Sequence, residues 1–217
     1  DPLTTHRANA TGFLNMLVGA RDAGAKRFVY AASSSTYGDS PSLPKVEDVI
    51  GRPLSPYAVT KYLNELYADV FGRTYGMATI GLRYFNVYGP RMDIFGLYTE
   101  VLIRWMERID AGQPPLIFGD GLQTMDFIDV RDVARANILA ALSPASDVAL
   151  NVGRCEETSL LELAQRLAAV MGRPDLVPVH EAERSVNPVP RRLAETRLAR
   201  ELTGFQAAIG LDENALQ

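Results

Sequence analysis

A tyrosine and a lysine four residues apart, Tyr57 and Lys61, are the residues whose types and spacing most suggest chemistry. At the start of a helix this spacing places both side chains on one face. A phenol with a pKa of about 10 is a poor base at neutral pH. An ammonium about 4 Å away favours the phenolate by a few kcal/mol, so Tyr57 can accept a proton from a substrate hydroxyl.

A run of three serines, Ser33-Ser34-Ser35, ends a short apolar segment upstream of this pair. A serine there can hydrogen-bond the same substrate oxygen and hold it in line with Tyr57. Removing a proton from a carbinol requires a group that takes the hydride, which implies a nicotinamide cofactor. Taken singly, the serines are also typical of a turn, and Tyr57 and Lys61 of a packed tyrosine beside a solvated lysine. Their order along the chain favours the catalytic interpretation.

The elements that would position these residues alternate between helix and strand. Apolar residues at helical spacing predict helices over residues 3–23 and 57–75, and continuous apolar runs predict buried strands over 28–32 and 78–83. A proline-rich loop separates the serines from the second helix. Strand, helix and strand in this order predict a right-handed crossover, and hence a Rossmann-like, doubly wound parallel α/β sheet.

After Arg91 the pattern changes, and we interpret residues 1–91 as the carboxy-terminal half of a nucleotide-binding domain. Residues 92–217 would form mainly a smaller mixed α/β lobe for substrate, with some segments returning to the sheet. Thr158 or Ser159 can cap a helix that runs to Met171. The other predicted elements are helices over 97–111, 131–142 and 193–202 and strands over 116–118, 126–130 and 148–152.

Composition excludes several classes of function. Lys and Arg number 22 against 26 Asp and Glu, a net charge of −4, so general attraction to nucleic acid or to an anionic membrane is not expected. One cysteine, Cys155, and two histidines form no metal-ligand pattern. No apolar stretch approaches the roughly twenty residues of a membrane span. We therefore expect no metal, and a cytoplasmic location.

The opening at Asp1, inside a helical pattern, suggests a piece of a longer parent chain.

Three strings together resemble the extended short-chain dehydrogenase/reductase family, the NAD-dependent epimerases and dehydratases. They run from Ala31 to Gly38, from Ser55 to Lys61 and from Arg83 to Arg91. Within the family the chain looks most like the UDP-sugar C4 epimerases. The resemblance implies NAD as cofactor, a nucleotide sugar, most simply a UDP-sugar, as substrate, and a homodimer formed through the helices 3–23 and 57–75.

Carried over position by position, the resemblance makes Tyr57 the base, Lys61 its electrostatic partner and a cofactor ligand, and Ser33 the catalytic serine. Asn9 matches an asparagine near the cofactor, and an ordinary helix-surface residue is an equal alternative. The remaining cofactor contacts would be Ala31, Ala32 and Phe85. The remaining substrate contacts would be Ser34, Ser35, Asn86, Gly96, Leu97, Tyr98 and Val101.

The sequence departs from the family at three places. The glycine-rich turn and the acidic ribose ligand of the dinucleotide site are absent from the chain, so NAD rather than NADP rests on analogy alone. Met125 stands where an arginine often contacts the diphosphate, and methionine offers no bidentate fork. The third departure is that residues 184–192 replace the late Arg-x-Gly-Asp stretch of the family. Within this segment Arg184 or Arg191 would supply a diphosphate contact, with solvated surface arginines as the alternative.

The implied reaction is epimerisation at C4 through a transient 4-keto sugar. Related dehydratases use an Asp-Glu pair after the catalytic residue, but Ser34 and Ser35 occupy those positions and do not titrate near neutral pH. Decarboxylation of a nucleotide hexuronic acid remains an alternative that we rank below epimerisation. A further alternative is a catalytically incomplete chain that only binds or dimerises.

Overall fold

Three parallel strands form the central sheet of the computed structural model, which describes residues 1–93, 101–183 and 191–211. The strand order is β1 (Arg27–Ser33), β2 (Ala78–Tyr84) and β7 (Val148–Val152). Their registers align Ser33 with Tyr84, and Tyr84 with Val152, so the three carboxyl ends lie together. The predicted parallel sheet is confirmed, and β7 is a segment from the second half of the chain that returns to it.

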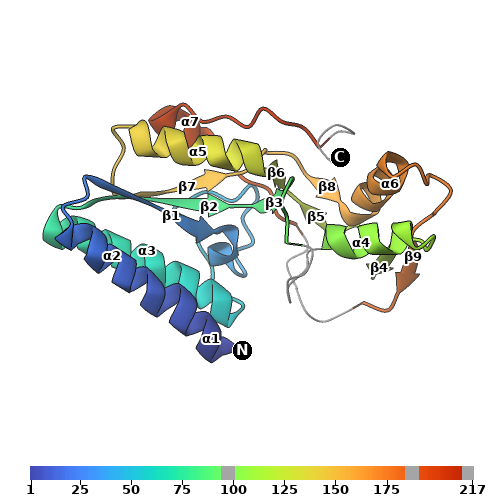
Figure 1. Cartoon of the computed structure of the whole chain (residues 1–217), viewed down its shortest axis with the longest axis horizontal. Helices are drawn as coiled ribbons and strands as arrows, with labels where there is room; N and C mark the ends of the chain where they lie inside the picture. The colour runs from blue at the N-terminus through green and yellow to red at the C-terminus, as the bar shows by residue number, and fades with distance from the viewer. Residues whose placement is uncertain (94–100, 184–190, 212–217) are drawn as a thin grey trace.

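Helices cover both faces of this sheet (Figure 1). On one face lie α2 (Gly12–Asp22) and α3 (Pro56–Tyr75), and on the other lie α5 (Val130–Leu142) and α7 (Arg197–Thr203). Each face has an apolar core, one around Leu17 and Phe71 and the other around the fully buried Ile80 and Leu150. The doubly wound arrangement expected from the alternating pattern is therefore present.

The predicted helix over residues 3–23 is one helical run with a wider turn inside it. It consists of α1 (Pro2–His6), a π-helical turn η1 (Arg7–Thr11) and α2. Single π-turns inside α-helices are frequent at functional sites. Here the turn contains Asn9, whose side-chain amide donates to Thr60 Oγ1 on α3 at 3.2 Å, so the turn is joined to the helix that carries Tyr57.

The start and end of α3 follow from local chemistry. Ser55 caps its amino end by accepting from the Ala58 N–H at 3.1 Å, and Pro56 occupies the first turn, where its missing N–H costs nothing. Gly76 ends the helix in the left-handed region at φ 65°, which glycine adopts without strain. The Ser55 cap and Pro56 fix the first turn, on which Tyr57 lies.

The rest of the second half forms a lobe beside the sheet (Figure 1). Its core includes Trp105 of α4 (Val101–Asp110) and Leu163 of α6 (Leu160–Val170), both almost fully buried. Ser159 caps α6 by accepting from the Glu162 N–H, as the sequence predicts. The small strands are β4 (Leu116–Phe118) paired with β9 (Val179–Glu181), and β5 (Thr124–Met125) paired with β8 (Thr158–Ser159).

Two predicted elements differ from those observed. The strand expected over 126–130 is shorter, β6 (Phe127–Asp129), because Asp129 caps α5 by accepting from the Arg131 N–H. This strand pairs with β3 (Asn86–Tyr88). The helix expected over 193–202 begins only at Arg197. Residues 193–195 are instead extended, because their backbone bonds to that of Lys45.

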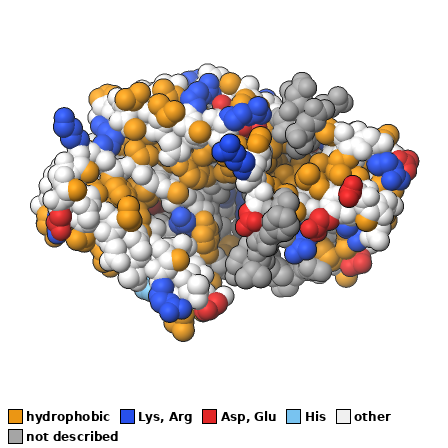
Figure 2. Space-filling view, in the orientation of Figure 1, with side chains coloured by type: hydrophobic (Ala, Val, Ile, Leu, Met, Phe, Trp, Pro, Cys, Tyr) orange, Lys and Arg blue, Asp and Glu red, His pale blue; other side chains and the backbone are white. Residues whose placement is uncertain are grey.

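Acidic and basic side chains are interspersed over the face of the molecule seen in Figure 2. Within the described ranges no helix combines the length and apolar character needed to cross a bilayer. The same residues contain no group of three or more His, Cys, Asp or Glu side chains that could hold a metal ion.

Gly81 of β2 provides a test of this packing. A Cβ built there would lie 2.6 Å from Cζ of Tyr30, whose ring is held against Phe13 at 5.0 Å between centroids. Overpacking of this kind costs about 1–3 kcal/mol, so we expect Gly81→Ala to lower the free energy of unfolding by that amount in urea titrations. The control Gly19→Ala adds a Cβ with no neighbour within 4 Å and should raise stability by about 1 kcal/mol. Equal effects of the two substitutions would contradict the described packing.

Candidate active site

A cleft of about 550 Å³ opens at the carboxyl ends of β1 and β2. This is the edge at which ligands bind in open parallel α/β sheets. Its wall comes from the end of β1, the following serine turn η2 (Ser34–Tyr37), the start of α3 and the end of β2. Nine of the residues predicted from the sequence line it: Ala31, Ala32, Ser33, Ser34, Ser35, Tyr57, Lys61, Phe85 and Asn86.

Tyr57 and Lys61 face this cleft from the first two turns of α3. The Lys61 ammonium lies 5.7 Å from the centroid of the Tyr57 ring and donates to the Ala31 carbonyl at 2.9 Å. Burial lowers the pKa of Lys61, because desolvation disfavours its charged form. An ammonium held this way favours a negative charge beside it. Tyr57 is 44% exposed and therefore accessible from the cleft.

Ser33 is the last residue of β1, and two hydrogen bonds fix the orientation of its hydroxyl group. Its Oγ accepts from the Ser35 N–H at 3.2 Å and from the Ser35 hydroxyl at 2.8 Å. With both oxygen lone pairs engaged, the remaining function of the Ser33 hydroxyl is to donate its proton. Ser33 is thereby prepared to donate to an oxygen placed near Tyr57.

Phe85 and Asn86 lie on the other side of the cleft, where β2 passes into β3. The Phe85 N–H donates to the Val152 carbonyl at 3.0 Å, and its ring is 5% exposed. Both the backbone and side-chain N–H groups of Asn86 donate to the Asp126 carbonyl, at 3.0 and 3.1 Å. The side-chain oxygen of Asn86 is held in one orientation as a result.

A buried polar network fixes α3 against the sheet. Arg83 of β2 donates to both carboxylate oxygens of Glu65, at 2.9 and 2.7 Å, and to the Tyr37 hydroxyl at 3.1 Å. Tyr37 in turn donates to the Asn151 side chain at 2.6 Å. Burial raises the pKa of Tyr37 to about 12, so this hydroxyl keeps its proton and acts as a structural donor.

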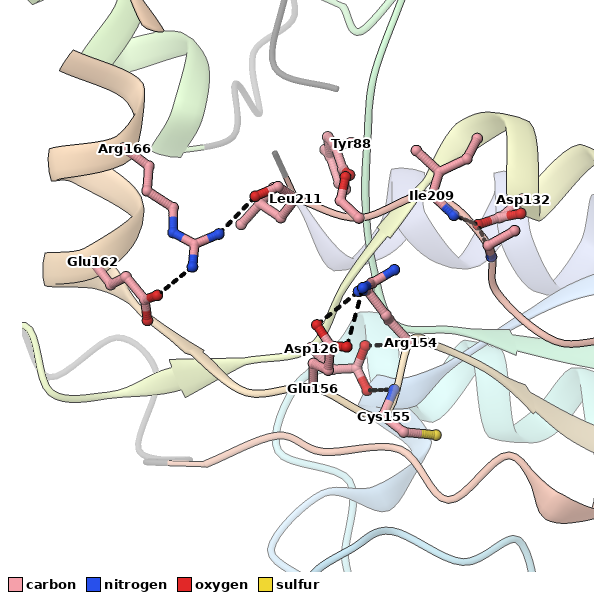
Figure 3. A network of polar contacts seen from close by, with 12 residues as sticks. Tyr88, Asp126, Asp132, Arg154, Cys155, Glu156, Glu162, Arg166, Ile209 and Leu211 are labelled. Carbon is pink, nitrogen blue, oxygen red and sulfur yellow. Dashed lines mark hydrogen bonds and ion pairs between the residues drawn. The ribbon is translucent and has the colours of Figure 1, made fainter. Parts of the chain in front are cut away.

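Asp126 joins segments that lie far apart in the sequence, and Figure 3 shows it beside Arg154 and Cys155. Its fully buried carboxylate accepts the backbone N–H groups of Arg154 at 2.7 Å, Cys155 at 2.9 Å and Ala194 at 3.0 Å. Burial raises the pKa of Asp126 to about 6, although these three donors favour the carboxylate. Asp132 makes a similar junction by accepting from the N–H groups of Ala208 and Ile209.

Four predicted site residues lie outside the cleft wall. Asn9 bonds to Thr60, and Val101 and Met125 pack against the core of the second lobe. Arg191 forms an ion pair with Glu157, which also accepts from the Thr124 hydroxyl. The remaining four, Gly96, Leu97, Tyr98 and Arg184, lie outside the described residues.

The cleft also contains residues that the sequence did not single out, chief among them Lys45 and Arg192. They are 147 positions apart in the sequence and come together through the backbone bridge between Lys45 and Ala194. A lysine within the proline-rich loop was the signal that could have marked the first of them. Nothing in the sequence indicates the bridge itself.

Comparison with known proteins identifies the family. Residues 1–153 match the NAD dependent epimerase/dehydratase family, and the chain belongs to it. It is 36% identical over 214 residues to a UDP-glucose 4-epimerase of Mycolicibacterium smegmatis, a match that covers 98% of this chain and 67% of that protein. The expected Rossmann-like fold and the resemblance to the family are confirmed.

Solved structures of similar proteins have the same fold. A Thermotoga maritima UDP-glucose 4-epimerase with UDP-glucose is 32% identical at a TM-score of 0.92, covering 100% of this chain and 69% of that one. MoeE5, solved with UDP-glucuronic acid and NAD, is 32% identical at a TM-score of 0.83, covering 97% and 69%. The chain spans between 53% and 67% of the length of three curated relatives that it matches.

The Arg83–Glu65 pair yields a matched prediction. Glu65→Gln leaves a buried guanidinium without its carboxylate and should lower the free energy of unfolding by about 3–5 kcal/mol. Asp69→Asn, one turn further along α3, breaks an ion pair with Arg73 whose side chains are 55% and 69% exposed, and should cost less than about 0.5 kcal/mol. Urea titration of both variants measures the difference. Similar losses would show that the buried network does not fix α3.

Proposed function

We propose that the protein is an NAD-dependent epimerase that inverts C4 of a nucleotide sugar. The observation that carries this proposal is the meeting of Ser33, Tyr57 and Lys61 in one cleft at the carboxyl edge of the sheet. Ser33 has its hydroxyl proton available, and Lys61 provides positive charge beside the phenol. Membership of the family supports the same chemistry.

The cleft suits the nicotinamide end of NAD. Ala31, Ala32 and Phe85 offer an apolar wall for a flat ring, and the Lys61 ammonium offers a donor for ribose hydroxyls. NAD bound there would supply the hydride acceptor and donor that carbinol oxidation requires. MoeE5 and the chain share this fold, and MoeE5 was solved with NAD.

The residues of the chain would then move one proton twice. Tyr57 as phenolate takes the proton of the C4 hydroxyl, while Ser33 donates a hydrogen bond to the same oxygen and holds it in line. The resulting 4-keto sugar turns within the cleft. Because the sugar has turned, hydride would return to the opposite face of C4. Tyr57 returns its proton to the C4 oxygen in the same step, and Lys61 stabilises the phenolate in each half of the cycle.

Epimerisation fits the serine turn better than dehydration does. Elimination of water from the sugar needs an additional acid and base near the reacting carbons. Ser34 and Ser35 occupy the positions next to Ser33, and the Ser35 hydroxyl is engaged by Ser33. Neither residue exchanges a proton usefully at neutral pH.

The test is conversion by the full-length protein with NAD, followed by NMR of UDP-glucose, UDP-N-acetylglucosamine and UDP-glucuronic acid. We expect the C4 epimer of at least one to form. Tyr57→Phe should lower kcat by about 10²–10⁴-fold, because the proton acceptor is lost, with substrate binding retained. Tyr75→Phe changes a half-exposed tyrosine at the far end of the same helix and should leave kcat unchanged. A Tyr57→Phe protein that keeps most of its activity would exclude Tyr57 as the base.

We further propose that the protein dimerises through α2 and α3, with a UDP-sugar as its small-molecule partner. Met16 on α2 and Val59, Leu66 and Val70 on α3 leave large apolar side chains exposed. The positions 59, 66 and 70 recur at helical spacing and share one stripe of α3.

Light scattering coupled to gel filtration tests the dimer. Leu66→Glu places a charge on the proposed interface and should shift the molar mass from dimer to monomer. Leu142→Glu, on α5 at the opposite face of the sheet, replaces a leucine that is 80% exposed and should leave the mass unchanged. A monomeric unsubstituted protein, or a dimer that survives Leu66→Glu, would contradict this interface.

A further inference from the structure

A second pocket lies between α3 and β7, the edge strand of the described sheet. Its volume is about 210 Å³, and its wall includes Tyr30 of β1, Thr79 of β2 and residues 147–149 at the start of β7. Thr79 is the second residue of β2, so the pocket lies toward the amino ends of the strands, away from the cleft at their carboxyl ends. The two sites share no lining residue.

Two buried hydroxyl groups in the wall of this pocket have no hydrogen-bond partner among the described residues. They belong to Thr79, which is 2% exposed, and Tyr30, which is 8% exposed. Neither oxygen is sealed from solvent, so both open into the pocket. A Cβ at Gly81 would lie 2.6 Å from the Tyr30 hydroxyl oxygen, and Gly81 is aligned with Ala149, so the phenol reaches across β2 toward β7. Buried hydroxyl groups are normally paired, so two unpaired ones in one pocket indicate a polar ligand.

The pocket carries negative charge. Asp147 lines it and forms no ion pair within the described ranges, and a Cβ at Gly72 would lie 2.3 Å from its Oδ1, so α3 passes close to this carboxylate. Asp69 lines the pocket from α3. Burial and, after it, the negative charge of Glu65 raise the pKa of Tyr30, so its hydroxyl stays protonated and the charge remains on the carboxylates.

We propose that this pocket binds a small organic cation through a primary ammonium group. An ammonium has three N–H donors that point in different directions. The pocket offers acceptors from three segments, the Tyr30 phenol of β1, the Thr79 hydroxyl of β2 and the Asp147 carboxylate before β7. A planar guanidinium matches one carboxylate better than three separate oxygens. The ring of Tyr62, which also lines the pocket, offers a face to the cation.

Calorimetric titration tests the site independently of the proposed C4 chemistry. The full-length protein, with NAD and UDP present to occupy the cleft, is titrated with n-butylammonium chloride at constant ionic strength. We expect one binding site per chain. Butyltrimethylammonium has the same charge and chain but no N–H donor, and should bind at least about tenfold more weakly.

Tyr30→Phe keeps the buried ring and removes only its hydroxyl. It should weaken the binding of n-butylammonium by about tenfold, since one hydrogen bond to a charged group is lost. Because this hydroxyl has no partner without the ligand, the free energy of unfolding without the amine should not fall. Thr79→Val provides a second variant with the same expected loss of affinity. The matched control Tyr67→Phe, on α3 outside the pocket, should bind the amine like the unsubstituted protein.

Equal binding of the two cations would show only general attraction to a negative surface and would overturn the proposal. So would no binding of n-butylammonium, or undiminished binding in both Tyr30→Phe and Thr79→Val. Leu66, at the proposed dimer interface, also lines the pocket, so a lysine of a second copy is another source of an ammonium. Light scattering during the titration separates the two sources. The molar mass should stay constant, and a fall on adding the amine would assign the pocket to that lysine and contradict a small-molecule ligand.

Discussion

Arg83 and Glu65 form a bidentate ion pair in the interior, with side chains 5% and 9% exposed, between β2 and the middle of α3. Glu65 follows Lys61 by one helical turn and Tyr57 by two, so all three lie on one face of α3. Fixing Glu65 against the sheet therefore fixes the rotation of the helix. The phenol and the ammonium are thereby directed into the cleft at the end of β1 and β2.

The Arg83 guanidinium also holds the wall of the cleft that lies opposite α3. Arg83 also donates to the Tyr37 hydroxyl and, at 2.7 Å, to the Glu47 carbonyl. Tyr37 ends the serine turn, and Glu47 lies in the proline-rich loop that contains Lys45. One side chain thus connects the helix that carries Tyr57, the turn that follows Ser33 and the loop that contains Lys45. Such a network is costly to break, so it holds the walls of the cleft in a fixed geometry.

Much of the fold could be predicted, because the apolar patterns are local. The runs around Val29 and Ile80 predict buried strands, and parallel strands place their carboxyl ends at one edge. Ser33 and Asn86 therefore had to lie near each other once the strands were recognised. Tyr57 and Lys61 followed from helical spacing alone. Their chemical roles remain predictions, since geometry places side chains without measuring reactions.

The remainder depends on contacts between distant residues. The helix expected from 193 begins at 197 because backbone groups of Lys45 pair with residues 193–195, and no local pattern encodes that choice. The same pairing brings Arg192 to the cleft. Met125 packs against the apolar core of the second lobe, and Arg191 pairs with Glu157. The sequence reveals neither contact. Asn9 lies in a π-helical turn, which has no sequence signature of its own.

The most direct test of the proposed mechanism is to trace the hydrogen on C4. The full-length protein with NAD would be incubated with a nucleotide sugar deuterated at C4, in ordinary water, and the product examined by NMR and mass spectrometry. We predict a C4 epimer that keeps its deuterium at C4, because the hydrogen leaves and returns within one cleft while only the hydroxyl proton passes through Tyr57. An epimer that has exchanged its C4 deuterium for solvent hydrogen would contradict this mechanism.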